Sequence, residues 1–129
     1  MISRDLLVHT GAVTLAIVIV VGANVSGLLT ETGYGSIAIA MVCYGLIFGG
    51  SHLYLALRGE DGLIPVDARW RYVVALFILL IAGAVLVSAG DRQLGPIVLR
   101  SVAIAVIVVT TLGYVITESI AGYRASRTE

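Results

Sequence analysis

Charged side chains are scarce in this sequence. Only 12% of its 129 residues are charged, whereas an ordinary soluble domain carries about 25%. At the same time, 59% of the residues are hydrophobic. A chain of this length forms one small domain, and a water-exposed surface would need more polar side chains than it supplies. The composition excludes an ordinary soluble domain and predicts that the apolar side chains face lipid.

The sequence also lacks the residues that several kinds of binding and catalytic sites require. Cys43 is the single cysteine, so no disulfide can form within the chain. The formal net charge is zero, which gives no reason to expect a nucleic-acid partner. No nucleotide-binding motif, nucleophile arrangement or cysteine–histidine metal pattern is present. We therefore expect a non-enzymatic protein with no catalytic residues and no metal site.

Long uncharged segments, in contrast, are abundant. They lie between Asp5 and Glu31, Glu31 and Arg58, Arg71 and Asp91, and Arg100 and Glu118. A helix needs about 20 residues to cross the core of a bilayer. The fourth segment reaches that length if its helix begins at Pro96 and Arg100 extends outward. We predict an all-α polytopic membrane protein, a four-transmembrane-helix bundle of two antiparallel hairpins, with spans 6–29, 36–57, 71–89 and 96–118.

The arginines predict how these spans are oriented. Six of the eight lie on one side of the predicted membrane, at Arg4, Arg58, Arg69, Arg71, Arg124 and Arg127. Basic residues concentrate on the cytoplasmic side. We therefore expect a multi-pass protein of the cell membrane with both termini inside, a cytoplasmic loop at 58–70 and a short cytoplasmic tail at 119–129.

Small residues predict where the helices touch. Packing in lipid depends on close backbone approach, which small side chains permit. The second span carries the pair Gly45 and Gly49, and the first span carries a comparable set at Ala12, Ala16, Ala23 and Gly27. Because a short turn joins these two spans, we expect the two sets to pack against each other.

Two histidines lie within the predicted spans. His9 is near the start of the first span and His52 near the end of the second, so an antiparallel hairpin brings them to similar depth. Each can simply hydrogen-bond a neighbouring group. Alternatively, they form a protonation-sensitive site, because histidine titrates near neutral pH. A third interpretation is a haem b bound by both rings, although two glycines favour close helix contact over the spacing that a haem needs.

The fourth span carries polar residues along one side, at Arg100, Thr111, Tyr114 and Glu118. The simplest interpretation is that Arg100 and Glu118 anchor the two ends of the helix at the membrane surfaces. The alternative is a polar lining that faces a pathway or a partner subunit.

Three functional hypotheses follow. The favoured one is an accessory or structural subunit, which lies in the bilayer and packs with copies of itself or within a larger membrane complex. The second is a small transporter or channel. The chain is similar in size to small multidrug transporters, whose site depends on a glutamate in the first helix, but no carboxylate lies between Asp5 and Glu31. The third is a haem-binding electron-carrier subunit that uses His9 and His52.

Overall fold

Four long helical segments dominate the computed structural model, which describes residues 3–29, 33–59 and 64–128. In chain order, the elements are α1 (Arg4–Val25), α2 (Tyr34–Gly45), η1 (Leu46–Gly50), α3 (Ser51–Leu57), α4 (Val66–Ala89), β1 (Gln93–Leu94), β2 (Ile97–Val98) and α5 (Leu99–Arg127). The element η1 is a π-helical turn that joins α2 to α3 without interrupting the helix. The prediction of an all-helical chain with four apolar, membrane-length helices is confirmed.

Two helices extend beyond their predicted spans by a full turn or more. The helix α4 begins at Val66 rather than at residue 71, directly after Pro65. Asp67 lies in its first turn, where a negative charge favours the positive end of the helix dipole. The helix α5 continues to Arg127, so most of the predicted tail is helical. The early start of α4 places Arg69 within the helix instead of within a loop.

The connection between α4 and α5 contains a small β-hairpin. Gln93 pairs with Val98 and Leu94 with Ile97, and Gly95 closes the turn with a φ of 63°. Glycine adopts this left-handed conformation without steric cost. The expectation that Pro96 begins the fourth helix is therefore wrong, because Pro96 follows Gly95 in the hairpin turn and α5 begins at Leu99.

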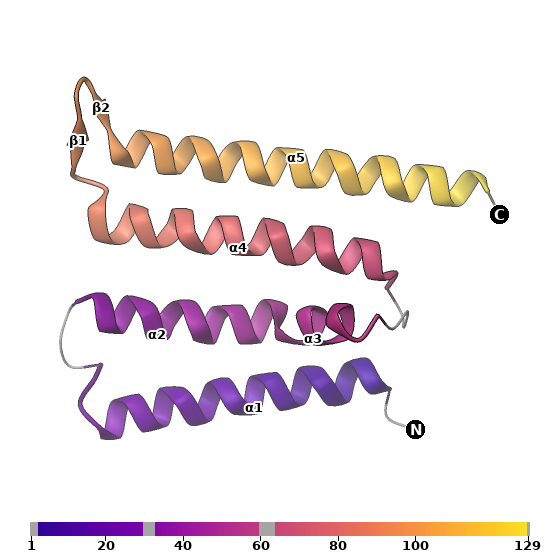
Figure 1. The fold of residues 1–129 in the computed structure, drawn as a ribbon, viewed down its shortest axis with the longest axis horizontal. Coiled ribbons are helices and arrows are strands. Elements are labelled where there is room, and N and C mark those ends of the chain that lie inside the picture. Colours follow the sequence, from indigo (N-terminus) through magenta and orange to yellow (C-terminus); the bar gives the residue numbers. More distant parts are fainter. Residues whose placement is uncertain (1–2, 30–32, 60–63, 129) are drawn as a thin grey trace.

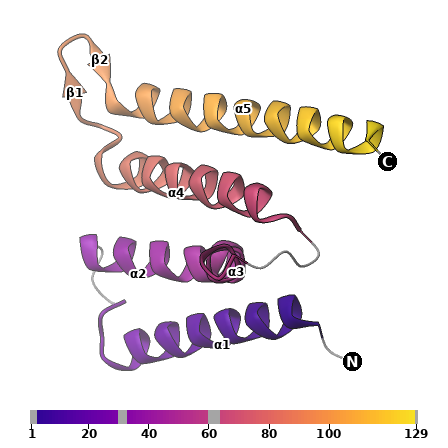
Figure 2. The same cartoon turned by 45° about the vertical axis from the view of Figure 1, so that its right-hand side comes forward.

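The helices lie side by side in one layer. The continuous segment α2–η1–α3 packs between α1 and α4, and α5 packs on the other side of α4. Figure 1 shows α1 and α5 at opposite edges of this layer, and the turned view in Figure 2 keeps the same order. No extended contact joins α1 to α5 among the described residues. The helices therefore form an open layer, and this arrangement does not confirm the predicted four-helix bundle.

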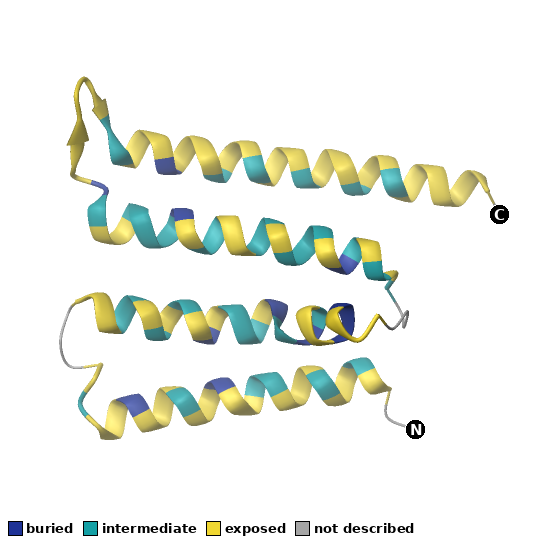
Figure 3. Ribbon diagram, in the orientation of Figure 1, coloured by how far each residue is buried: buried dark blue, intermediate teal, exposed yellow. Residues whose placement is uncertain are grey.

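Most buried positions lie on sides of the helices that face a neighbouring helix (Figure 3). Among the residues that the structure describes, the buried hydrophobic ones are Ala16, Ala23, Cys43, Leu55, Ala56, Ala82 and Ala103. Five of these seven are alanine, whose short side chain allows the close backbone approach on which packing in lipid depends. The layer is therefore held by backbone proximity rather than by large interlocking side chains.

The pair Gly45 and Gly49 faces α4, not α1. A Cβ atom at Gly49 would lie 2.5 Å from Leu76 Cδ2, and one at Gly45 would lie 3.7 Å from Leu80 Cδ1. Both leucines belong to α4. The prediction named the wrong partner because the middle helical segment has a neighbour on each side and therefore has two packing faces.

The contact with α1 uses other residues of the middle segment. A Cβ atom at Gly50 would lie 3.1 Å from Ala12 Cβ, and the Cys43 thiol lies 3.8 Å from the carbonyl oxygen of Ala16. Gly27 follows the end of α1 with a φ of 84°, so it belongs to the turn rather than to the helical face on which we placed it.

Candidate functional site

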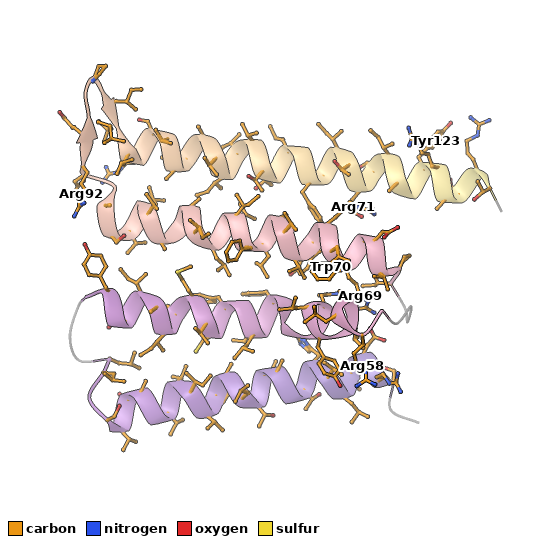
Figure 4. The ribbon with its side chains drawn as sticks, in the orientation of Figure 1. Arg58, Arg69, Trp70, Arg71, Arg92 and Tyr123 are labelled. Atoms are coloured by element: carbon orange, nitrogen blue, oxygen red, sulfur yellow. The ribbon has the colours of Figure 1, made fainter. Side chains whose placement is uncertain are left out.

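The start of α4 carries two arginines that face opposite ways. Arg69 and Arg71 are two residues apart, and at 3.6 residues per turn their side chains leave the helix about 200° apart. Figure 4 shows Arg69 on the side of α4 toward α3, and Arg71 on the side toward α5. The two arginines therefore join α4 to different neighbours.

Arg69 is the most deeply buried charged residue among those described, with 1% of its surface exposed. Its Nη2 donates to Asp5 Oδ1 of α1 at 2.5 Å, and its Nε donates to the carbonyl oxygen of Ile64 at 3.2 Å. Its Nη1 lies 3.2 Å from His52 Nδ1 of α3. One guanidinium thus connects the first, second and third long helical segments.

The three contacts of the guanidinium compensate for the energetic cost of burying the charge of Arg69. An isolated ion in an apolar environment is strongly disfavoured, so buried charges are paired and hydrogen-bonded. The planar guanidinium presents donors in several directions at once, and here its three nitrogens have three different partners. Ionisable groups at membrane depth frequently mark functional sites. We therefore take Arg69, Asp5 and His52, referred to below as the Arg69 cluster, as the candidate functional site.

His52 also contacts an aromatic side chain, that of Tyr72. Its ring centroid lies 4.7 Å from that of Tyr72, and the Tyr72 ring lies 6.2 Å from that of Tyr114 on α5. The π-helical turn η1 ends at Gly50, two residues before His52. Such turns are rare in helices and are often found at functional sites. The rings of Tyr72 and Tyr114 thus connect the Arg69 cluster to α5.

Arg71 of α4 forms an ion pair with Glu118 of α5. The Arg69 cluster, Tyr72, Tyr114 and this ion pair are called the polar row below. Arg71 Nε lies 2.6 Å from Glu118 Oε1, and Arg71 Nη2 lies 3.4 Å from Oε2. The two side chains are 35% and 28% exposed, so Arg71 is far more accessible than Arg69. Beside it, a groove of about 470 Å³ runs between α4 and α5, bordered by Trp70, Arg71, Tyr114 and Thr117.

The predicted histidine pair is divided between two environments. His52 is half-buried in the Arg69 cluster, whereas His9 is exposed on α1. Among the contacts within residues 3–29, 33–59 and 64–128, no hydrogen bond joins the two rings. The ring of His52 has Arg69 as its hydrogen-bond partner instead.

The predicted polar residues of the fourth span also separate. Tyr114 and Glu118 face α4, but Thr111 is exposed. Arg100 lies at the other end of α5 and pairs with Asp91 at 2.9 Å, with both side chains well exposed. The four residues therefore do not form one enclosed lining.

Sequence reasoning missed the importance of Arg69 and Asp5. Asp5 was used only as a charge that bounds the first span, and Arg69 was used only to predict orientation. A usable signal existed, because Pro65 and Asp67 are typical of a helix start. Recognising it places Arg69 inside the helix, where a charge needs a partner of opposite sign.

Comparison with known proteins identifies no relative: no protein family, no curated protein and no solved structure matches this chain. In the part of the chain that the structure describes, no three histidine, cysteine or acidic side chains come together as a metal site requires. The features that bear on function are therefore the Arg69 cluster and the open layer of helices.

Proposed function

We propose that this chain is a non-enzymatic, multi-pass protein of the cell membrane that works as a subunit of a membrane assembly. The assembly forms by self-association or with another membrane protein. The proposal is supported chiefly by the single open layer of helices, which leaves both broad faces of the chain uncovered.

The size of the uncovered surface supports this proposal. The chain exposes 8842 Å², whereas a compact folded monomer of the same mass exposes about 6,500 Å². Lipid covers the apolar part of the excess. The exposed ring of His9 is polar and lies within a candidate span, and a protein neighbour can supply the hydrogen bond that acyl chains lack.

The outer side of α5 is part of the surface that the open layer leaves uncovered. Within α5, all of which the structure describes, only Ala103 is buried. The side away from α4 carries Val102, Val109, Ile116 and Tyr123, all of them exposed. These residues recur every seven positions, which is the spacing that keeps one helix face against another helix over several turns.

The proposed orientation keeps both termini on the cytoplasmic side. Figure 4 shows Arg58, Arg69, Arg71 and Tyr123 at one end of the layer and Arg92 at the other. The same arginine bias supports an inside location for the loop after α3 and for the end of α5. Labelling of single cysteines at Gly59 and Ser126 from the same face of sealed vesicles, and at Gln93 from the other face, is the expected result. Labelling of Gly59 and Ser126 from opposite faces would contradict it.

The assembly itself is tested by cross-linking in native membranes. In a chain with Cys43 replaced by alanine, a single cysteine at Val109 is expected to give a cross-linked dimer or a cross-link to another protein. The matched variant has its cysteine at Ala103, which is buried against α4, and should give neither. Gly49→Leu is unsuitable for this test, since Gly49 contacts Leu76 of its own chain.

Two outcomes decide the proposal. Cross-links at Val109 but not at Ala103, with a matching mass in mild detergent, support an assembly through α5. A monomeric mass at all protein concentrations, with no cross-link at Val102, Val109 or Ile116 and no copurifying protein, would refute it.

A small transporter or channel is the second candidate, and the Arg69 cluster is the observation that favours it. Buried ionisable groups in membrane proteins are common along proton and ion pathways. The test is flux of protons or cations into proteoliposomes, compared between the native chain and His52→Ala. Flux that depends on His52 would support a transporter or channel function, and the absence of flux for a broad panel of ions would refute it.

A haem bound by His9 and His52 is the third candidate and has the least geometric support. Arginine is only a hydrogen-bond donor, so Nδ1 of His52 is an acceptor in its contact with Arg69 and Nε2 carries the proton. A protonated Nε2 has no lone pair for iron. An absorption spectrum of protein purified from haem-replete cells tests the candidate, and a colourless preparation would exclude it.

A further inference from the structure

The contact between Arg69 and His52 fixes the protonation of the imidazole. The guanidinium of arginine stays charged and has no acceptor atom. Because Arg69 Nη1 lies 3.2 Å from His52 Nδ1, the guanidinium donates and Nδ1 accepts. His52 in this structure is therefore the neutral imidazole with its proton on Nε2.

Protonation of Nδ1 cannot be accommodated in this geometry. A proton there removes the lone pair that accepts the hydrogen bond, and it places an imidazolium against a guanidinium. Two positive groups would then face each other at hydrogen-bonding distance within a site that is closed to water around Arg69. Low local polarity makes such repulsion stronger than it is in water.

Among residues 3–29, 33–59 and 64–128, the other charged and titratable groups that act on His52 or contact its ring come from two helices. The helix α4 contributes Arg69 and Tyr72, and α1 contributes Asp5 and His9. The π-helical turn η1 has the sequence LIFGG and contributes none. Asp5 carries the charge that would favour an imidazolium, but its carboxylate is already paired with Arg69. A proton on His52 would therefore compete with Arg69 for Asp5.

We propose that Nδ1 of His52 is a proton-binding site that controls the contact between α1, α3 and α4. With the imidazole neutral, Arg69 holds Asp5 and His52 together. When a proton binds Nδ1, the Arg69–His52 hydrogen bond is lost and the two cations separate, which loosens the ends of these helices. The ligand is the proton, and the site does not depend on whether the chain self-associates.

Thermal unfolding of the full chain in mild detergent tests the inference. Trp70, the single tryptophan, neighbours Arg69 in sequence and reports unfolding by fluorescence. As pH falls from about 8 to about 5, across the range in which a histidine gains its proton, the Tm of the native chain is expected to fall by about 5 °C. His52→Gln should show a flat profile, because its amide oxygen accepts the Arg69 hydrogen bond and does not titrate in this range.

The second histidine supplies the matched control. His9→Gln should still lose Tm as pH falls, since the guanidinium of Arg69 contacts Nδ1 of His52 and not the ring of His9. This variant also leaves His52 as the sole histidine. Its imidazole ¹⁵N resonances at pH 8 should then show an Nε2–H tautomer, with Nδ1 as the acceptor.

Several results would overturn the inference. One is a His52→Gln profile as steep as that of the native chain, and another is a native chain whose Tm does not change between pH 8 and pH 5. The third is an Nδ1–H tautomer, or a charged imidazolium, at pH 8 in the His9→Gln variant. The resonance test uses native His52, so it decides the question even if His52→Gln fails to fold.

Discussion

Replacing Arg69 by methionine should destabilise the chain more than removing any other single charge of the polar row. The change keeps an unbranched side chain of similar length but removes the bonds to Asp5, His52 and Ile64. Breaking a buried ion pair by deleting one partner costs about 3–5 kcal/mol. Because the Asp5 side chain is 24% exposed, its carboxylate regains some hydration, and we expect about 3 kcal/mol, the lower end of that range.

Thermal unfolding followed by Trp70 fluorescence measures this loss. At several degrees per kcal/mol for a chain of this size, the Tm of Arg69→Met should be lower by about 10 °C. Arg71→Met is the matched control, two residues away on the same helix. Its ion pair with Glu118 is partly exposed on both sides, and exposed ion pairs contribute little, so its Tm should change much less.

A double-mutant cycle separates the ion pair from the packing of the arginine stem. Asp5→Asn and Arg69→Met act on the same contact, so their combined effect should be clearly smaller than the sum of the two single effects. Equal Tm losses for Arg69→Met and Arg71→Met would refute the reasoning from burial. Additive effects of Asp5→Asn and Arg69→Met would show that the two side chains do not stabilise each other.

Three further predictions concern the packing of glycines in helices, the backbone strain at Gly95 and the burial of Cys43. Gly49→Ala should lower the Tm slightly, because its Cβ would lie 2.5 Å from Leu76 Cδ2 and the leucine methyl must shift, whereas Gly83→Ala has open space around it and should keep or raise the Tm. Gly95→Ala should lower the free energy of unfolding by about 1 kcal/mol, measured by thermal unfolding, because an L-residue is strained at positive φ. The buried Cys43 should resist a maleimide until the chain unfolds, and rapid labelling of folded protein would contradict its burial.

The four helices could be predicted because hydropathy is a local property. The spacing between charged residues such as Asp5, Glu31 and Arg58 reports directly how much uncharged chain is available to cross a bilayer. The ends of the helices were harder, since the same residues can extend a helix or form a turn. Pro96 illustrates this difficulty: proline favours a helix start, but the preceding Gly95 allowed a hairpin instead.

The contacts between helices depend on information that is not local. Gly45 and Gly49 indicate close approach, but nothing in their spacing specifies whether α1 or α4 provides the opposite surface. The Arg69 cluster unites residues that are 17 and 64 positions apart in the chain. A pattern within one helix does not reveal such a meeting, and only the sign of the charges on Asp5 and Arg69 suggested that they could pair.

The π-helical turn at Leu46–Gly50 makes the chain sensitive to length at this point. Its hydrogen bonds span one residue more than those of an α-helix, so removing one residue there would restore a regular helix. The shortened segment would be equally apolar and would cross a membrane equally well. Its final turns, however, would be rotated by about 100° relative to the preceding ones, which would carry the His52 imidazole away from the guanidinium. A homologue that keeps both side chains but has one residue fewer between Cys43 and His52 should therefore lack the proton site.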